Sequence, residues 1–273
     1  MKLKNKKFII TSLTIIALLA ITVIQIGKNS GNQEETRLTS SQGLSNKKIG
    51  WGIKRNDNHE QPDLGKVNKE ILEKNNGIAM GNNNDKYIYL TFDEGYEAGH
   101  TTQILSTLKE NNVKVTFFIT AHYLNTQPDL VKQMIEEGHI VGNHTVNHKS
   151  MPSLTEEQLK EELMNLHTAV YDKFNYEMHY MRPPKGEYSE RVLSQTVRLG
   201  YIPVMWSFAY ADWDEKAQPS NEEGTNKIIN NLHNGEIMLL HATSKTNMEI
   251  LDTVIKQIKE MGYEIKSIDD FAK

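Results

Sequence analysis

Two carboxylates stand side by side at Asp93 and Glu94, directly after the apolar run YIYLTF at residues 87–92. Adjacent anions at the end of a strand repel each other unless a positive group lies beside them. Successive side chains of a strand point in opposite directions, so the two residues need not share a role. One can bind a metal ion while the other faces a substrate as a general base. The competing interpretation is a solvated turn before Gly95.

The segment GNHTVNH places His144 and His148 four residues apart. In a helical turn this spacing puts both imidazoles on one side, where both can coordinate the same ion. Two surface histidines would have the same spacing, but a carboxylate from another strand end favours a metal centre. The chain has no cysteine, so a metal must be held by His, Asp and Glu. Two imidazoles, one carboxylate and an open position are typical of a hydrolytic centre, and Zn²⁺ is the expected ion.

Three further segments carry polar groups that could do chemistry. In MRPPKG, two prolines and a glycine fix a loop in which Arg182 can pair with a buried carboxylate and keep it ionised. In ADWD, Asp212 can fix the tautomer of a histidine, and Trp213 suggests a wall that faces a sugar. His241 follows a strand made up almost entirely of hydrophobic residues. Because its two ring nitrogens need hydrogen-bond partners there, a catalytic role is favoured. The alternatives are a rigid connector and a polar turn beside a packing tryptophan.

These residues follow short apolar runs that alternate with helical patterns. One helix is expected to begin after Thr155, with Gln158 at capping-box spacing, and to end near Phe174. A second covers Met248 to Ile258 and stops at Gly262. Strands are expected at 87–92, 115–120, 139–142, 202–208, 236–240 and 264–268.

This alternation predicts an α/β fold with a parallel sheet covered by helices, either a barrel or a doubly wound sheet. In a parallel barrel the ends of the strands all lie on one face, where such enzymes build their sites. We therefore expect one pocket to collect the polar residues that follow the strands, namely Asp93, Glu94, His144, His148, Asp212 and His241.

The N-terminal region predicts that the folded domain, which follows it, lies outside the cytoplasm. Residues 8–26 carry no charge and follow the basic flank MKLKNKK, so they form a membrane anchor or a signal. Lysines before the span keep the N-terminus inside and send the rest across the membrane. We expect an anchor or signal over 1–27, a flexible linker over 28–48 and a folded domain over 49–273, opened by an entry segment over 49–84 whose first part, residues 49–65, is irregular.

The charge distribution argues against nucleic acid as a partner. Residues 1–30 hold five lysines and no acidic residue, which leaves 26 basic and 35 acidic residues in the remainder. A body with this excess of acidic groups repels a polyanion.

The segments TFDEG, HTVNH, RPPKG, DW and LLH, in that order, resemble the five motifs of polysaccharide deacetylases, carbohydrate esterase family 4. With the segment WGIKRNDNHEQPDLG at residues 51–65, the chain is most similar to the delta-lactam-biosynthetic de-N-acetylases. Those enzymes remove acetyl from muramic acid in spore-cortex peptidoglycan. The resemblance implies a distorted, incomplete (β/α) barrel and a catalytic domain over 49–273.

The resemblance also implies roles for individual residues. Asp93 corresponds to the general base and Arg182 to the group that positions it. His241 corresponds to the general acid and Asp212 to its partner. The backbone N–H of Lys185 falls where the family has an oxyanion donor.

Glu94, His144 and His148 correspond to the ligands of one divalent metal ion. Most of the family has Asp where this chain has Glu94, and the muramic-acid subgroup often has Asn. Glutamate keeps the charge but is longer by one methylene, so the ion could be shifted or bound in another mode.

The expected activity is metal-dependent removal of acetate from N-acetylmuramic acid in the glycan strands of peptidoglycan. A peptide-stripping amidase could act first, and the freed amine could then close the lactam. One alternative is a deacetylase of N-acetylglucosamine in wall glycan or a chitin-like polymer, against which the segment 51–65 argues. The other is a non-catalytic wall-binding protein, which would be expected to have lost at least one catalytic residue.

Overall fold

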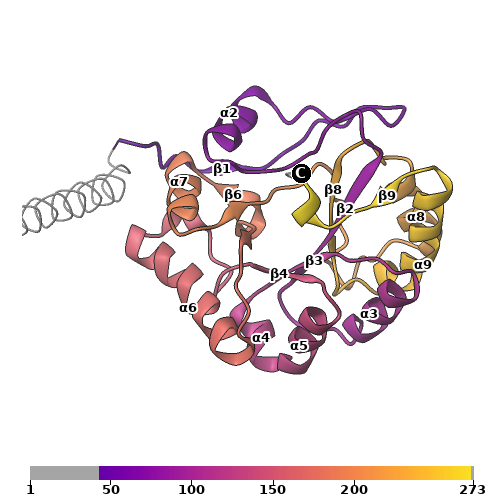
Figure 1. Cartoon of the computed structure of the whole chain (residues 1–273). Coiled ribbons are helices and arrows are strands. Elements are labelled where there is room, and N and C mark those ends of the chain that lie inside the picture. The colour runs from indigo at the N-terminus through magenta and orange to yellow at the C-terminus, as the bar shows by residue number, and fades with distance from the viewer. Residues whose placement is uncertain (1–42, 272–273) are drawn as a thin grey trace, which may run out of the picture. The chain divides into compact units, whose positions relative to one another are not determined.

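A curled parallel sheet forms the centre of the protein, in a computed structural model that describes residues 43–271 (Figure 1). Its strands follow the order β7-β5-β4-β3-β2-β8, and β9 pairs with β2. All of these pairs are parallel. The strands are β2 (Tyr87–Glu94), β3 (Thr116–Ile119), β4 (Ile140–Asn143), β5 (Tyr180–Met181), β7 (Ile202–Pro203), β8 (Glu236–His241) and β9 (Glu264–Ile265).

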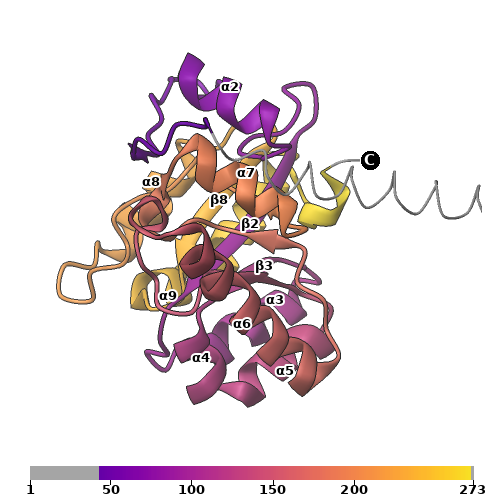
Figure 2. The same ribbon diagram turned by 90° about the vertical axis from the view of Figure 1, so that its left-hand side faces the viewer.

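Helices surround this sheet on its outer side, and a short second sheet lies near one end (Figures 1 and 2). The second sheet pairs β1 (Ile49–Gly50) with β6 (Glu187–Tyr188) in antiparallel fashion. The described α-helices are α2 (Lys66–Lys74), α3 (Thr101–Glu110), α4 (Ala121–Thr126), α5 (Pro128–Glu136), α6 (Glu156–Phe174), α7 (Glu190–Arg198), α8 (Asn221–Ile229) and α9 (Lys245–Glu260).

The predicted α/β fold with an incomplete (β/α) barrel is confirmed, and the open side lies between β7 and β8. Between these two strands the described residues form one isolated bridge, Phe208 to Met238, beside a hydrogen bond from Ser207 N to Ile237 O of 3.0 Å. The strand predicted over 202–208 is therefore too long, because β7 ends at Pro203 and the following residues cross to β8. The other predicted strands are present, although β9 is shorter than predicted.

The strands separate two hydrophobic clusters, because alternate side chains face opposite sides. The outer cluster lies beneath the helices and includes Leu90 and Phe92 of β2. The inner cluster lies within the curl of the sheet and includes Tyr89 of β2 and Phe118 of β3. This alternation decides which strand-end side chains enter the barrel.

Local sequence signals fix the helices that support the strands. The predicted capping box of α6 is present, with Gln158 N donating to the Thr155 hydroxyl and the Gln158 side chain accepting from Thr155 N. Helix α9 begins at Lys245, earlier than predicted, after the N-cap Ser244. It ends before Gly262, whose φ of 80° suits glycine.

The segment before β2 is tied to the barrel by polar contacts from several of its side chains. Trp51 Nε1 donates to Trp206 O at 2.9 Å, and Trp51 N donates to Gly186 O at 2.8 Å. The Gln61 amide donates to Gly81 O and to Asn234 O at 2.9 and 2.8 Å. Residues Ser45–Lys273 form one compact unit.

The predicted anchor or signal over 1–27 and most of the predicted linker lie outside the described residues. Within residues 43–271, no helix combines the length and the apolar character that a membrane span requires.

Candidate active site

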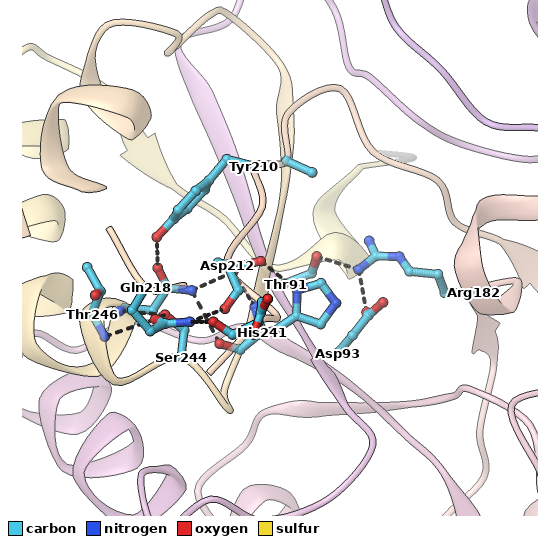
Figure 3. Close-up of polar contacts among 12 residues, drawn as sticks. Thr91, Asp93, Arg182, Tyr210, Asp212, Gln218, His241, Ser244 and Thr246 are labelled. Atoms are coloured by element: carbon cyan, nitrogen blue, oxygen red, sulfur yellow. Dashed lines mark hydrogen bonds and ion pairs between the residues drawn. The ribbon is translucent and has the colours of Figure 1, made fainter. Parts of the chain in front are cut away.

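Asp93 lies on the inner side of β2 and is paired with an arginine that is 0% exposed (Figure 3). Arg182 Nη1 donates to Asp93 Oδ1 and to the Thr91 hydroxyl, both at 2.8 Å. The guanidinium carbon also lies 4.3 Å from the centre of the Phe118 ring. Burial opposes ionisation of Asp93, but the charge and the hydrogen bond of Arg182 outweigh burial and lower its pKa. The predicted pairing of Arg182 with a buried carboxylate is therefore present.

His241 ends β8 in register with Asp93 on the neighbouring strand. Its Nδ1 donates to Asp212 Oδ1 and its backbone N–H donates to Asp212 Oδ2, both at 2.8 Å. Burial favours the neutral ring, but the hydrogen bond and the charge of Asp212 outweigh burial and raise the pKa of His241. The predicted pair is thus formed, and Nε2 is left free to give a proton to a leaving group.

A set of polar residues that the sequence analysis missed holds Asp212 in place (Figure 3). Asn247 Nδ2 donates to Asp212 Oδ2 at 2.6 Å, and Gln218 Nε2 donates to the Asp212 carbonyl at 2.7 Å. The Tyr210 hydroxyl donates in turn to Asn247 Oδ1. No short motif contains these residues, so their role depends on long-range packing that spacing alone does not reveal.

His144 and His148 face each other beside Asp93. His144 Nδ1 donates to Arg182 O at 2.8 Å, so Nε2 keeps its lone pair, and this Nε2 lies 3.1 Å from His148 Nε2. Burial lowers the pKa of both rings, and that of His148 falls to about 4. Residues 144–148 form a loop rather than the predicted helical turn, with His148 at a φ of 52°. The two neutral nitrogens nevertheless converge as donors to one ion would.

Glu94 does not join this pair. Its side chain is 0% exposed, and neither carboxylate oxygen has a hydrogen bond of ordinary geometry. The groups that act on its pKa are Glu97, Asp93 and Thr101 rather than the two histidines, and burial raises the pKa well above the usual range. Across residues 43–271, no group of three or more His, Asp or Glu side chains is arranged to hold a metal ion. The predicted ligand set of Glu94, His144 and His148 is therefore not assembled, because the second carboxylate of β2 faces the helices.

Lys185 and Trp213 lie at the border of the site. Lys185 has φ 60° and ψ 9°, and its charge contributes to the lowered pKa of His148, so the RPPKG loop does reach the histidines. The oxyanion role of its backbone N–H stays a prediction. Trp213 is 59% exposed, and its ring centre lies 6.1 Å from that of His241. An exposed indole beside His241 can pack against a sugar ring.

Comparison with known proteins relates this arrangement to one family. A family model described as polysaccharide deacetylase matches residues 80–204. The peptidoglycan-N-acetylmuramic acid deacetylase PdaA of Bacillus subtilis is 42% identical over 231 residues, which are 84% of this chain and 88% of PdaA. The peptidoglycan-N-acetylglucosamine deacetylase PgdA of Listeria monocytogenes is 33% identical over 68% of this chain and 39% of PgdA.

Solved structures agree with the sequence comparison. The structure of PdaA, described as a family 4 carbohydrate esterase, matches with a TM-score of 0.82 at 43% identity over 84% of this chain and 98% of that chain. A family 4 carbohydrate esterase from Bacillus anthracis matches with a TM-score of 0.72 at 40% identity over the same shares. The chain therefore belongs to the polysaccharide deacetylase family, carbohydrate esterase family 4.

Proposed function

We propose that this protein is a peptidoglycan de-N-acetylase that removes acetate from N-acetylmuramic acid residues. The observation that carries the proposal is the facing pair of Asp93 and His241, in register on neighbouring strands. Each has its own buried partner, Arg182 for the base and Asp212 for the acid. A base and an acid held apart in this way suit hydrolysis of an amide between them. PdaA, whose name gives muramic acid as its substrate, is similar over most of both chains.

His144 and His148 would hold the divalent metal ion on which we expect the reaction to depend. Their Nε2 atoms lie 3.1 Å apart, and Arg182 O fixes the tautomer of His144. A bound ion supplies Lewis-acid polarisation and lowers the pKa of water. Imidazole donors and the absence of cysteine favour Zn²⁺ among the common ions.

The chain's own residues account for the proton transfers. Asp93, kept ionised by Arg182, accepts the proton of the attacking water. The Lys185 N–H stabilises the oxyanion that forms at the amide carbonyl oxygen when the water attacks the carbonyl carbon. His241 donates its Nε2 proton to the departing amine as the C–N bond breaks, and acetate leaves.

We infer further that the protein acts outside the cytoplasm, where its peptidoglycan substrate lies. The span predicted at residues 8–26 would anchor it to the membrane or direct its secretion. The product carries a free amine beside the lactyl carboxyl of muramic acid, and closure between them gives the muramic lactam of spore cortex. An amidase that strips the peptide stem would act before this enzyme.

The test compares substrates with the full-length chain in detergent. Acetate release is measured from peptide-free glycan, from peptide-bearing glycan and from N-acetylglucosamine oligomers, with Asp93→Asn as the inactive control. We expect release from muramic acid residues of peptide-free glycan, and loss of about 10²-fold or more in the variant. Faster release from N-acetylglucosamine would support the alternative substrate. No release from any glycan would support a non-catalytic wall-binding protein.

A further inference from the structure

The register of the sheet separates Asp93 from Glu94. Asp93 shares its row with His241 of β8, Phe118 of β3 and Gly142 of β4. Phe118 belongs to the inner cluster, and Asp93 and His241 form the catalytic pair on that side. This row therefore faces the interior of the barrel.

The next row faces the other way. Glu94 lies opposite Ile119, which lies opposite Asn143, which lies opposite Met181. Ile119 and Met181 belong to the outer cluster, and Asn143 Nδ2 donates to Leu163 O of helix α6 at 2.9 Å. A one-residue step along a strand moves a side chain to the opposite face. The row of Glu94 thus faces the helices.

The surroundings of Glu94 agree with this placement. Glu97 accepts from the backbone N–H of His100 at 2.7 Å and from the Tyr123 hydroxyl at 3.0 Å, so its carboxylate lies at the start of α3 and beside α4. Glu97, Thr101 and Tyr123 are the groups that interact electrostatically with Glu94 on this side. In this buried place the Glu94 carboxylate has no hydrogen bond of ordinary geometry, and the Thr101 side chain is the donor that acts on its pKa.

We infer that Glu94 is not a ligand of the metal ion, and that its carboxylate lies buried beneath α3 and α4 while His144 and His148 hold the ion. The inference rests on the proposed function only for the presence of an ion. It means that the protein ligands of the ion are the two imidazoles of His144 and His148.

Metal binding to the full-length, chelator-treated chain tests this directly, with no need for turnover. Co²⁺ is titrated and followed by its visible absorption in wild type, Glu94→Gln and His144→Gln. We expect Glu94→Gln to keep the same spectrum and an affinity within about threefold of wild type, while His144→Gln loses about 100-fold or more. A loss of tenfold or more in Glu94→Gln, or an altered spectrum, would overturn the inference.

Thermal melting of the metal-free protein gives a second, independent readout. Glu94→Met removes a buried carboxylate that has no hydrogen bond of ordinary geometry and keeps the length of the side chain, so we expect a higher Tm than wild type. A lower Tm in Glu94→Met would show that the carboxylate has a stabilising partner, contrary to the inference. If wild type binds no Co²⁺, the metal-dependent function fails, and the melting comparison alone decides the role of Glu94.

Discussion

At the scale of single residues, Asp212 contacts His241 at two points, and this double contact controls the charge of the imidazole. Burial alone would favour a neutral ring, yet the hydrogen bond and the carboxylate charge raise its pKa. A group whose pKa is raised on folding stabilises the protein below its unfolded pKa, and this contribution is lost as pH rises through the folded value. The same protonated form is the one that can protonate a departing amine.

Asp212→Asn should therefore move the alkaline limb of the activity profile to lower pH. The amide can still accept from Nδ1, but it no longer supplies the negative charge that keeps His241 protonated. We expect kcat/KM to fall at every pH, and to begin falling with pH earlier than in wild type. Acetate release across a pH series measures both effects. An unchanged alkaline limb would remove His241 from the general-acid role.

The ion pair of Arg182 and Asp93 gives a second prediction at the residue scale, which concerns the free energy of unfolding. Arg182→Met leaves a buried carboxylate without its cation, which should lower the free energy of unfolding by about 3–5 kcal/mol near neutral pH. Because the pKa of Asp93 is lowered on folding, its contribution is present above the unfolded pKa and lost as pH falls. The deficit of Arg182→Met should therefore shrink in acid.

Adding Asp93→Asn to Arg182→Met should recover part of this loss, since no unpaired charge then remains buried. Denaturant melts of the two single variants and the double variant give the coupling energy. Strictly additive losses would show that the ion pair does not stabilise the folded state.

The types of these residues were predictable from the sequence, whereas the contacts that support them were not. Asp212, Arg182 and His241 stood out because charged or titratable groups next to apolar runs need partners. Asn247 and Gln218 are ordinary polar residues at helix starts and loops, and only the fold brings them to Asp212.

At the scale of elements, the pleat of β2 determines where its two adjacent carboxylates point. The sequence analysis ended the strand at Phe92 and expected both following carboxylates in one pocket, Asp93 as the base and Glu94 as a metal ligand. The strand continues to Glu94, so Asp93 faces inward and Glu94 faces the helices. Strand ends are the least certain boundaries in a sequence, and here two residues decide which carboxylate reaches the site.

Gly142 supports the site from β4, in the inner row that contains Asp93. A Cβ at Gly142 would lie 2.5 Å from the Phe118 ring, on which the Arg182 guanidinium rests. Gly142→Ala should displace this ring, lower the free energy of unfolding by about 1–3 kcal/mol and reduce kcat through Arg182. Gly50→Ala, where nothing lies within 4 Å of the added carbon, is the matched control. Equal melting and activity in the two variants would contradict this account.

At the scale of the whole molecule, the segment before β2 joins parts of the barrel that are far apart in sequence. Trp51 contacts both Gly186, in the RPPKG loop, and Trp206, beyond β7. The sequence predicted an entry segment at the start of the folded domain with an irregular stretch at 49–65, and the structure adds the short strand β1 and the helix α2 to this segment. Its contacts follow from the curling of the sheet into an incomplete barrel, and strand patterns predicted a barrel only as an alternative to a doubly wound sheet.

The overall charge gives the last prediction, which concerns the rate of association with substrate. Residues 31–273 carry 26 basic and 35 acidic residues, while muramic acid in a peptide-free glycan carries a lactyl carboxylate. Like charges slow encounter over distances up to the Debye length, about 30 Å at 0.01 M salt and about 8 Å at 0.15 M. We therefore expect kcat/KM for peptide-free glycan to rise with salt over this range.

The same glycan with its carboxylates converted to methyl amides is the matched control, and its kcat/KM should change little with salt. A fall in kcat/KM with salt for the charged glycan would show that a local positive group dominates the approach. Lys185 is the nearest candidate, because its charge already acts on His148 within the site. In that event Lys185→Gln should reverse the salt dependence, since the net acidic charge of the domain would then determine how the anionic strand approaches the pocket.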